Sequence, residues 1–516
     1  MMRRLIPLVI LVLLVVAAYI FVVSPGLTAA DRVPVAAAPA VAPTSSGGVT
    51  TNATPIPSTI DLGSVASPHV LAWNPNTAQL AWYDAKGKSV AIGKASTGKA
   101  IVIPCGRTSA GDKTLIYEGG DVAQTVLMPL DNGTALSLGS GIGLSCAIPG
   151  LTQFSPDGNR LGTIRFDQTV GNQTYTQGTL RVIQISDGTE QFSLDGVASF
   201  DLQNDGAVAL QFFANTKNQA NSADLIFWDG SKKRNIEQGI ALANQDTKKV
   251  CQFVSAKVLR VSDNVYTMLG EQCQPGGTTW RLRRTPLNGG AAGTDLQSGP
   301  TGGKYAYSAD TNNMYLLPGG NQILFSVPNG GTLDLADLAR ISVDKGEVAK
   351  VQSGVAVGRF PPAGPKRFLF SPKGDKLITM TRTGDGSEQL FIYDFNALDK
   401  APVAIPSAGG AKADRINGAA WTADGQKVYF DVIGDTQALF VYDVAGGQSK
   451  LVARGTYQGL AINDDGSQAA TAEQIKGATP ADNRINFVLI STADGNKTNI
   501  IEGAKGDQAL TPFFVR

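Results

Sequence analysis

The hydrophobic and polar positions divide the chain into three parts. An unbroken apolar run, Leu5 to Val23, follows a short basic tip, and residues 25–58 then show no apolar period and are rich in Ala, Pro, Thr and Ser. From residue 59 to residue 516, short apolar stretches alternate with Gly, Asp, Asn and Pro. Short strands separated by tight turns have this pattern. We therefore predict a transmembrane signal anchor at 1–24, a disordered linker at 25–58 and an all-β domain at 59–516.

The apolar run has the length of a membrane-spanning helix, which needs about 20 residues to cross about 30 Å of hydrocarbon. Arg3 and Arg4 precede the run, and a basic flank favours the cytoplasmic side. This predicts a single-pass protein with a cytoplasmic N-terminus and an extracytoplasmic β domain. The alternative is a signal peptide cleaved near Ala29 or Ala30, which would release the same domain outside the cell.

A turn motif recurs through the β domain at intervals of about 40–50 residues, the length of one propeller blade. In most copies a large apolar residue ends a strand, and a residue pair ending in Gly closes the turn before the next strand. Asp in this pair supplies a side-chain acceptor, and Gly supplies the positive φ of the turn. The turn residues predicted in this way are Phe154, Pro156, Asp157 and Gly158; Phe370, Pro372 and Gly374; Trp421, Asp424 and Gly425; and Asp465 and Gly466.

This strand–turn–strand unit resembles the TolB-type, WD40-like β-propeller repeat of exported bacterial proteins. The resemblance is clear over four or five units, and it is weaker over residues 105–150 and 240–365. It implies a β-propeller fold. It does not imply an activity, because propellers of this kind include envelope scaffolds as well as peptidases and lyases.

Nine segments of suitable length follow one another, and they are 68–104, 112–150, 151–196, 198–240, 248–299, 303–352, 366–407, 416–454 and 456–503. Propellers typically have four to eight blades, so we interpret one weak segment as an insertion and expect about eight four-stranded blades, with seven as the alternative. The terminal segment Leu510 to Val515 is expected to pair with the opening strands and close the ring. Only Leu333 to Ile341 has helical spacing.

The composition excludes several classes of function and of active site. The chain has 516 residues with 44 Lys and Arg against 43 Asp and Glu, so it lacks the basic surplus of a nucleic-acid binder. Its one histidine, His69, excludes a multi-His metal centre, and the chain has no G-x-S-x-G motif of a propeller hydrolase. We predict no catalytic residue, no cofactor and no metal ligand. Asp-rich turns such as Asp464 to Gly466 are explained by turn chemistry without Ca²⁺.

The four cysteines are Cys105, Cys146, Cys251 and Cys273. An even number in an exported chain favours disulfides, and four cysteines allow three connectivities. We favour the pairs Cys105–Cys146 and Cys251–Cys273, because each pair falls inside one proposed blade.

Two functions remain open. The first is a non-catalytic module at the cell envelope that binds a protein or glycan partner through loops on the propeller face, with the membrane contacted by the N-terminal helix. The alternative is an enzyme that acts on envelope or extracellular saccharides through carboxylates in the central funnel. The first is favoured because no motif with a chemical mechanism is present. Nucleic acid is not an expected partner.

Overall fold

A computed structural model describes the following residues of the chain: 54–56, 69–74, 76–77, 79–84, 86–94, 103–108, 114–119, 124–129, 135–138, 152–165, 178–214, 220–243, 250–274, 277–300, 314–317, 319–328, 335–356, 369–382, 386–397, 400–407, 413–479, 482–505 and 513–515. The predicted signal anchor and nearly all of the predicted linker lie outside these residues. Within them, no helix has the length and apolar character needed to span a membrane.

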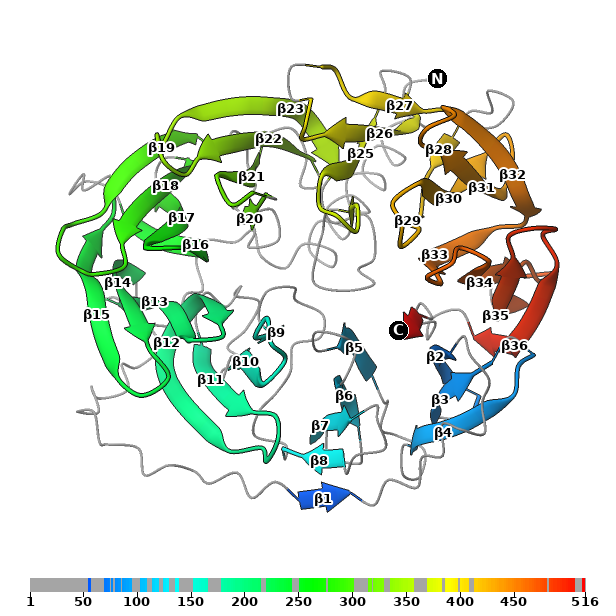
Figure 1. The fold of residues 1–516 in the computed structure, drawn as a ribbon, viewed down its shortest axis with the longest axis horizontal. Helices are drawn as coiled ribbons and strands as arrows, with labels where there is room; N and C mark the ends of the chain where they lie inside the picture. The colour runs from blue at the N-terminus through cyan, green and yellow to red at the C-terminus, as the bar shows by residue number, and fades with distance from the viewer. Residues whose placement is uncertain are drawn as a thin grey trace, which may run out of the picture. The chain divides into compact units, whose positions relative to one another are not determined.

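All elements assigned in the described part are β-strands, and they form antiparallel groups in chain order (Figure 1). We call each group a unit. The first unit comprises β37 (Phe513–Val515), β2 (His69–Asn74), β3 (Gln79–Tyr83) and β4 (Ser89–Lys94). The second comprises β5 (Ile103–Thr108), β6 (Thr114–Gly119), β7 (Gln124–Pro129), β8 (Ala135–Ser137) and β1 (Thr54–Ile56). The third comprises β9 (Thr152–Phe154), β10 (Arg160–Arg165), β11 (Gly178–Gln184) and the first half of β12 (Glu190–Gln203).

The fourth unit comprises the second half of β12, β13 (Gly206–Ala214), β14 (Ala220–Trp228) and β15 (Lys233–Ala241). The fifth comprises β16 (Val250–Val261), β17 (Asn264–Gln274), β18 (Thr278–Pro286) and β19 (Thr294–Pro300). The sixth comprises β20 (Met314–Leu316), β21 (Gln322–Pro328), β22 (Leu335–Ser342) and β23 (Val348–Ala356). The seventh comprises β24 (Leu369–Phe370), β25 (Lys376–Arg382), β26 (Glu388–Asp394) and β27 (Val403–Ile405).

The eighth unit comprises β28 (Ala413–Arg415), β29 (Ala419–Trp421), β30 (Lys427–Gly434), β31 (Ala438–Asp443) and β32 (Gln448–Arg454). The ninth comprises β33 (Tyr457–Ile462), β34 (Gln468–Ile475), β35 (Arg484–Ser491) and β36 (Lys497–Lys505). Apart from the pairs β1–β8 and β37–β2, strands that are neighbours in a unit are close in the chain, and the strand pairs are antiparallel. This is the topology of propeller blades rather than of a sandwich.

Apolar side chains of consecutive units share common cores. Tyr429 and Leu439 of the eighth unit, for example, pack in one cluster with Leu460 and Val488 of the ninth. Strand β30 is therefore buried almost throughout, which explains why its sequence is a nearly continuous apolar run rather than an alternating one. A sheet that is covered on both faces by its neighbours needs those neighbours in order to fold. The described residues thus form a β-propeller-type domain.

The two ends of the domain meet in the first unit. Strand β37 pairs with β2 so that Val515 lies opposite His69 and Phe513 opposite Leu71 (Figure 1). The core of this unit also joins the last one, because Val70 packs in a cluster with Phe487 and Leu489. The predicted pairing of the C-terminal segment with the opening strands is confirmed.

Side chains also tie the first strand of one unit to the next unit. The amide of Gln153 on β9 donates to the Phe200 carbonyl at 2.9 Å and accepts from the Leu202 N–H at 3.1 Å, both on β12. In the same way, the Asp201 carboxylate on β12 accepts from the Arg260 N–H on β16 at 2.8 Å. The backbone groups that these side chains bond lie on strand edges that face another unit. Among the described strands, none of the same sheet covers these edges, so the side chains supply the hydrogen-bond partners.

Three expectations from the sequence concern residues 335–342, residues 54–56 and the number of blades. Residues 335–342 form strand β22 instead of helix, because pairing with both β21 and β23 outweighs their weak helical spacing. Thr54–Ile56 lies in the predicted linker yet pairs with β8, and Pro55 is tolerated because β1 is an edge strand. Strands occur in each of the nine predicted segments, so the described sheets single out no segment as the insertion on which eight blades depended.

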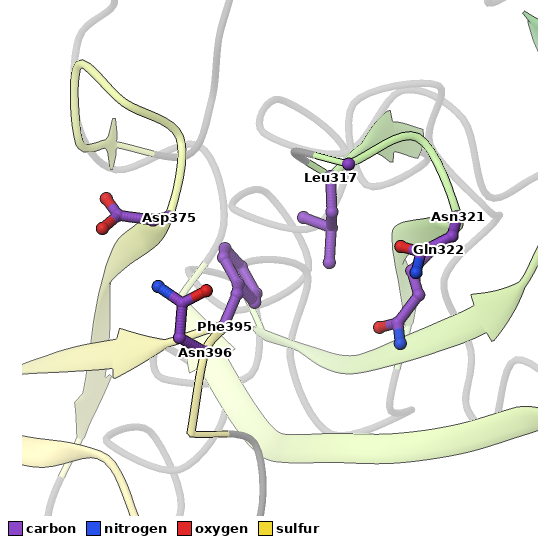
Figure 2. Close-up of a pocket in the computed structure, with 7 residues that line it drawn as sticks. Leu317, Asn321, Gln322, Asp375, Phe395 and Asn396 are labelled. Atoms are coloured by element: carbon purple, nitrogen blue, oxygen red, sulfur yellow. The ribbon is translucent and has the colours of Figure 1, made fainter.

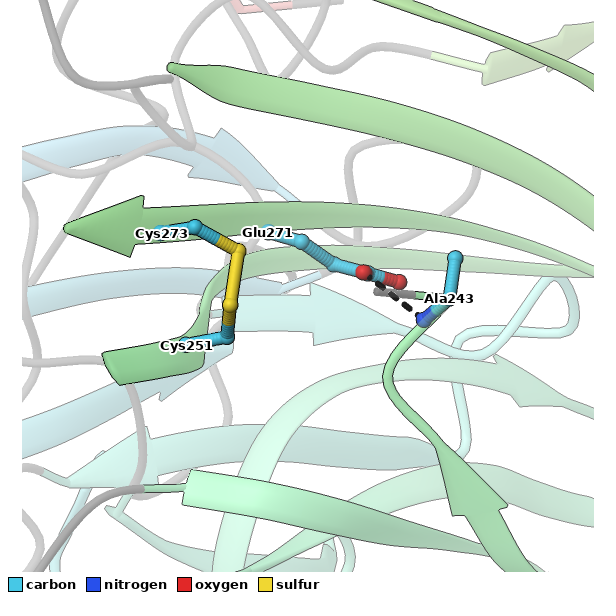
Figure 3. Close-up of a disulfide and its surroundings, with 4 residues drawn as sticks. All are labelled: Ala243, Cys251, Glu271 and Cys273. Atoms are coloured by element: carbon cyan, nitrogen blue, oxygen red, sulfur yellow. Dashed lines mark hydrogen bonds between the residues drawn. A yellow bond between two sulfur atoms is a disulfide. The ribbon is translucent and has the colours of Figure 1, made fainter. Parts of the chain in front are cut away.

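The disulfide Cys251–Cys273 is present, as predicted (Figure 3). The two cysteines lie directly opposite each other on β16 and β17, with their Cα atoms 4.1 Å apart. The pairing of Cys105 with Cys146 stays a prediction, because Cys146 lies outside the described residues.

Candidate functional site

The predicted turn motifs form one recurring structure, which we call the repeat turn. In the copy at 155–160, the Ser155 N–H donates to the Arg160 carbonyl at 2.9 Å and the Gly158 N–H donates to the Ser155 carbonyl at 2.9 Å. The Ser155 hydroxyl donates to Asp157 at 2.6 Å and accepts from the Arg160 N–H at 2.9 Å. Gly158 has a φ of 75°, which explains the requirement for glycine.

The copy at 422–427 repeats these contacts with different residues. The Thr422 hydroxyl donates to Asp424 at 2.6 Å and accepts from the Lys427 N–H at 3.0 Å, and Gly425 has a φ of 71°. Hydrogen bonds from the Thr422 hydroxyl and the Gln426 N–H lower the pKa of Asp424. The copy at 463–468 uses Asn463 in place of the hydroxyl residue, and its Asp465 accepts from the Ser467 N–H at 2.8 Å.

The copy at 371–376 departs from the motif in the position of its Asp. Lys373 stands where the other copies have Asp, and Asp375, two residues later, accepts instead from the Ser371 hydroxyl at 2.7 Å. Partial burial raises the pKa of Asp375, but the hydrogen bonds from Ser371 and Lys376 outweigh this and lower the pKa. Asp375 is therefore an ionised acceptor at neutral pH.

Sequence reasoning missed a further repeat turn at 317–322. The Leu317 N–H donates to the Gln322 carbonyl at 2.9 Å, and the Gly320 N–H donates to the Leu317 carbonyl at 3.1 Å. Gly320 has a φ of 71°, as in the other copies. This copy has neither the aromatic residue nor the Asp-Gly pair of the motif. In the sequence, the pair Gly319-Gly320 was the one feature that indicated a turn here.

The large apolar residues of the motif point between units. The Trp421 ring N–H donates to the Leu369 carbonyl of the preceding unit at 3.0 Å. Phe370 contacts the Tyr315 ring of the sixth unit, with centroids 5.2 Å apart. Phe154 packs against the core shared with the second unit. The aromatic position of the motif thus serves packing between units.

Consecutive repeat turns contact one another. An added Cβ on Gly425 would lie 3.6 Å from Pro372 of the preceding turn, and the Tyr429 hydroxyl donates to the Gly466 carbonyl of the following turn at 3.1 Å. We call the surface formed by the four consecutive turns 317–322, 371–376, 422–427 and 463–468 the turn face.

A second loop of each unit joins this face. The residue after the third strand donates its N–H to the carbonyl of the turn residue before the second strand, as from Phe395 to Asp375 and from Val444 to Gln426, both at 2.9 Å. The same bond recurs in other units, and the further donor–acceptor pairs are Ile185–Asn159, Leu287–Asp263, Val343–Asn321 and Thr492–Ser467.

Two grooves lie on the turn face between consecutive units. The first, of about 240 Å³, lies between the sixth and seventh units and is lined by Leu317, Gly319, Asn321, Gln322, Asp375, Phe395 and Asn396 (Figure 2). The second, of about 370 Å³, lies between the seventh and eighth units and is lined by Ser371, Lys373, Asp375, Lys376, Asp424, Gly425, Gln426, Val444 and Ala445. Asp375 lines both grooves. Each groove takes its lining from two units, and such concave surfaces are the usual location of ligand sites.

The buried charges of the described residues serve other contacts. Glu271 on β17 pairs with Arg281 on β18 at 2.9 Å. Glu271 also accepts from the Ala243 N–H at 2.9 Å, as Figure 3 shows. Burial raises the pKa of Glu271, and the Arg281 charge opposes this. Arg283 pairs with Glu237 of the preceding unit and with Asp295 of its own. Of these ion pairs, Arg283–Glu237 connects the fourth and fifth units and the others lie within the fifth, and none of them lines either groove.

Asp431 is a buried carboxylate that forms no ion pair among the described residues. It lies on β30, is 1% exposed, and neither of its oxygens makes a hydrogen bond of good geometry to a described residue. Burial raises its pKa to about 7, although the nearby Gly418 N–H and Asn417 side chain oppose this in part. A grouping of three or more His, Cys, Asp or Glu side chains suited to a metal ion does not occur in the described part of the chain.

Comparison with known proteins assigns no family to the chain. No protein-family model and no curated protein sequence matches it. Solved structures with similar folds include a eukaryotic initiation factor, with 14% identity over 87% of this chain and 98% of that chain and a TM-score of 0.49. TolB from Acinetobacter baumannii has 12% identity over 69% of this chain and 82% of its own, with a TM-score of 0.29. An oligogalacturonate lyase in complex with manganese has 13% identity over 82% and 94%, with a TM-score of 0.39. These low values assign no activity or partner.

Proposed function

We propose that the chain is a membrane-anchored, TolB-like β-propeller outside the cytoplasm, and that its turn face is a non-catalytic surface for binding a protein or glycan at the cell envelope. The observation that carries the proposal is the pair of grooves between consecutive repeat turns, lined by polar side chains of two units. Loops on a rigid scaffold of strands are the common location of binding residues. The basic tip and apolar run at 1–24 support the anchor.

The protonation states of the groove carboxylates argue against a general acid in either groove. Asp375 and Asp424 line the grooves, and hydrogen bonds lower the pKa of both. A general acid needs a pKa near the working pH, so neither group suits proton donation at neutral pH. The fully buried carboxylate Asp431, whose pKa is raised, lines neither groove.

We propose nine blades rather than eight. Each of the nine units has its own antiparallel strands, and β37 completes the first one. Long β12 supports this count, because its residues 190–197 pair with β11 of one unit and its residues 197–203 pair with β13 of the next. A strand that ends one blade and begins another leaves no room for an insertion between them.

Compartment and anchoring are tested together in bacterial cells that produce the full chain with an N-terminal and a C-terminal epitope. After removal of any outer barrier, added protease should destroy the C-terminal epitope while the N-terminal one survives, and both should remain in carbonate-washed membranes. Protection of both epitopes would contradict the proposed compartment. A soluble product that begins near Ala30 would contradict only the anchor and favour the cleaved signal peptide.

The enzyme alternative has its own readout. The purified protein is incubated with envelope and extracellular polysaccharides, and new reducing ends or unsaturated sugars are measured. We expect none. Product that disappears in an Asp375→Asn variant would favour the enzyme and overturn the non-catalytic assignment.

A further inference from the structure

We propose that the groove between the sixth and seventh units binds one ring of a neutral saccharide, stacked on Phe395 and hydrogen-bonded by Asp375, Asn396 and Gln322. This inference rests on the proposed binding function and names its ligand class. Its basis is a comparison of equivalent positions within the chain, together with the chemistry of the groove lining.

The repeat makes Phe395 conspicuous. The residue that donates its N–H to the turn before the second strand is Ile185, Leu287, Val343, Val444 or Thr492 in five other units, and Phe395 here. The residue that accepts this bond is Asn159, Asn321, Gln426 or Ser467 in four of those units, Asp263 in the fifth unit, and Asp375 here. Among these six described pairs, Phe395–Asp375 is the one that combines an aromatic ring with a carboxylate, and both side chains line the same groove. The bond does not require an aromatic ring, because the other five units form it with an aliphatic residue or Thr.

Phe395 packs against two other aromatic rings. Its centroid lies 5.7 Å from that of Tyr393 and 6.1 Å from that of Phe370. Figure 2 shows the Phe395 ring in the middle of the groove, with Asp375 and Asn396 on one side and Leu317, Asn321 and Gln322 on the other. A fixed aromatic ring between planar polar side chains is suited to a ring that has an apolar C–H face and a rim of hydroxyl groups.

The polar groups supply both halves of hydroxyl hydrogen bonds. The Gln322 carbonyl accepts from the Arg340 guanidinium at 3.0 Å, which directs the Gln322 amide to donate elsewhere. Asp375 bonds to Ser371 at 2.7 Å and to Lys376 at 3.0 Å, and a carboxylate with about four acceptor positions retains capacity for a ligand hydroxyl. A sugar hydroxyl both donates and accepts, so it satisfies an amide and a carboxylate together.

The charge and size of the groove limit the class of ligand further. No Lys or Arg lines this groove, so it offers no cationic side chain to a phosphate group or a uronic acid, and anionic ligands are disfavoured. The neighbouring groove differs, because Lys373 and Lys376 line it and Val444 replaces the aromatic ring. The volume of about 240 Å³ is below the range of about 300–1,000 Å³ for drug-sized ligands, which fits a single ring of a longer chain.

The test uses the full-length protein in a detergent without a sugar headgroup. Saturation-transfer NMR and calorimetric titration are run with cellotetraose, mannotetraose and chitotetraose, and with a polyuronate tetramer as the acidic control. Two variants copy residues of equivalent positions and should fold: Phe395→Val, as in Val444, and Asp375→Asn, as in Asn321. Val444→Ala in the neighbouring groove is the matched control.

We expect at least one neutral tetrasaccharide to bind and the polyuronate to bind more weakly. Phe395→Val should weaken binding by about tenfold, the effect of a lost aromatic contact. Asp375→Asn should also weaken it, and Val444→Ala should leave it unchanged. Absence of binding by all three neutral tetrasaccharides would overturn the inference, and so would equal binding by Phe395→Val. Either result would leave the proposed binding module standing, because a partner at another part of the turn face would still be captured there.

Discussion

Replacing Asp431 by Asn should stabilise the protein at alkaline pH. Asp431 is fully buried on β30 and makes no hydrogen bond of good geometry to a described residue, and burial raises its pKa from 3.8 to about 7. Asn has nearly the same shape and carries no charge at any pH. The substitution therefore removes the cost of burying the ionised carboxylate and leaves the packing intact.

The magnitude follows from the shift in pKa. One pKa unit corresponds to 1.36 kcal/mol, so a rise from 3.8 to about 7 costs about 4 kcal/mol of stability once the carboxylate is ionised in both states. The folded state binds more protons than the unfolded state between these two values, so stability falls as pH rises from about 4 to about 7. Below pH 4 both states are protonated, and the variant should match the wild type.

Urea unfolding of the purified full-length protein, followed by circular dichroism at pH 4, 6 and 8, measures this difference. The free energy of unfolding of Asp431→Asn should exceed that of the wild type by about 4 kcal/mol at pH 8 and by nearly nothing at pH 4. Asp424→Asn is the matched control, and its effect on the free energy of unfolding should have the opposite sign. Because the pKa of Asp424 is lowered, its carboxylate stabilises the folded state, and this stabilisation is lost as pH falls. A gain that is independent of pH, or a loss at pH 8, would refute the reasoning.

Three further changes test the packing between and within units. Removing the disulfide by Cys251→Ala with Cys273→Ala should cost about 3 kcal/mol in the free energy of unfolding, because the bridge spans 22 residues; an unchanged urea midpoint would contradict this. Arg281→Met leaves Glu271 buried with an unpaired charge and should lower the free energy of unfolding by about 3–5 kcal/mol. Acidification protonates Glu271 and should restore part of this stability. A loss of stability that is the same at every pH would show that packing is responsible. Gly425→Ala has space for its Cβ but keeps a φ of 71°, so it should lower the free energy of unfolding by about 1 kcal/mol; an unchanged free energy of unfolding would contradict the turn geometry.

Local features of the fold could be predicted from the sequence because they depend on a few adjacent residues. Asp424 and Gly425 form the predicted turn, since its hydrogen bonds and positive φ are set within six residues. The pairing of Cys251 with Cys273 follows from their positions on one hairpin. The residues 335–342 mark the limit of this reasoning, because strand pairing on both sides decides their conformation.

Features that need two units could not be predicted in this way. The groove at Phe395 arises where side chains of different units meet, and no sequence spacing encodes that meeting. Gln153 is an ordinary polar residue in the sequence, yet it joins two units through the Phe200 carbonyl and the Leu202 N–H. The repeat itself was the signal that could have found Phe395, because the equivalent residues are aliphatic or Thr once the units are aligned on their shared hydrogen bond.

The central claim is that the turn face binds a partner outside the cytoplasm, and crosslinking in intact cells tests it most directly. A photoreactive residue is placed at Gln426 on the turn face or, as control, at Leu451, which is 44% exposed on β32. The account predicts a discrete crosslinked product from position 426 and none from position 451. Equal products from both positions, or products from position 451 alone, would contradict it.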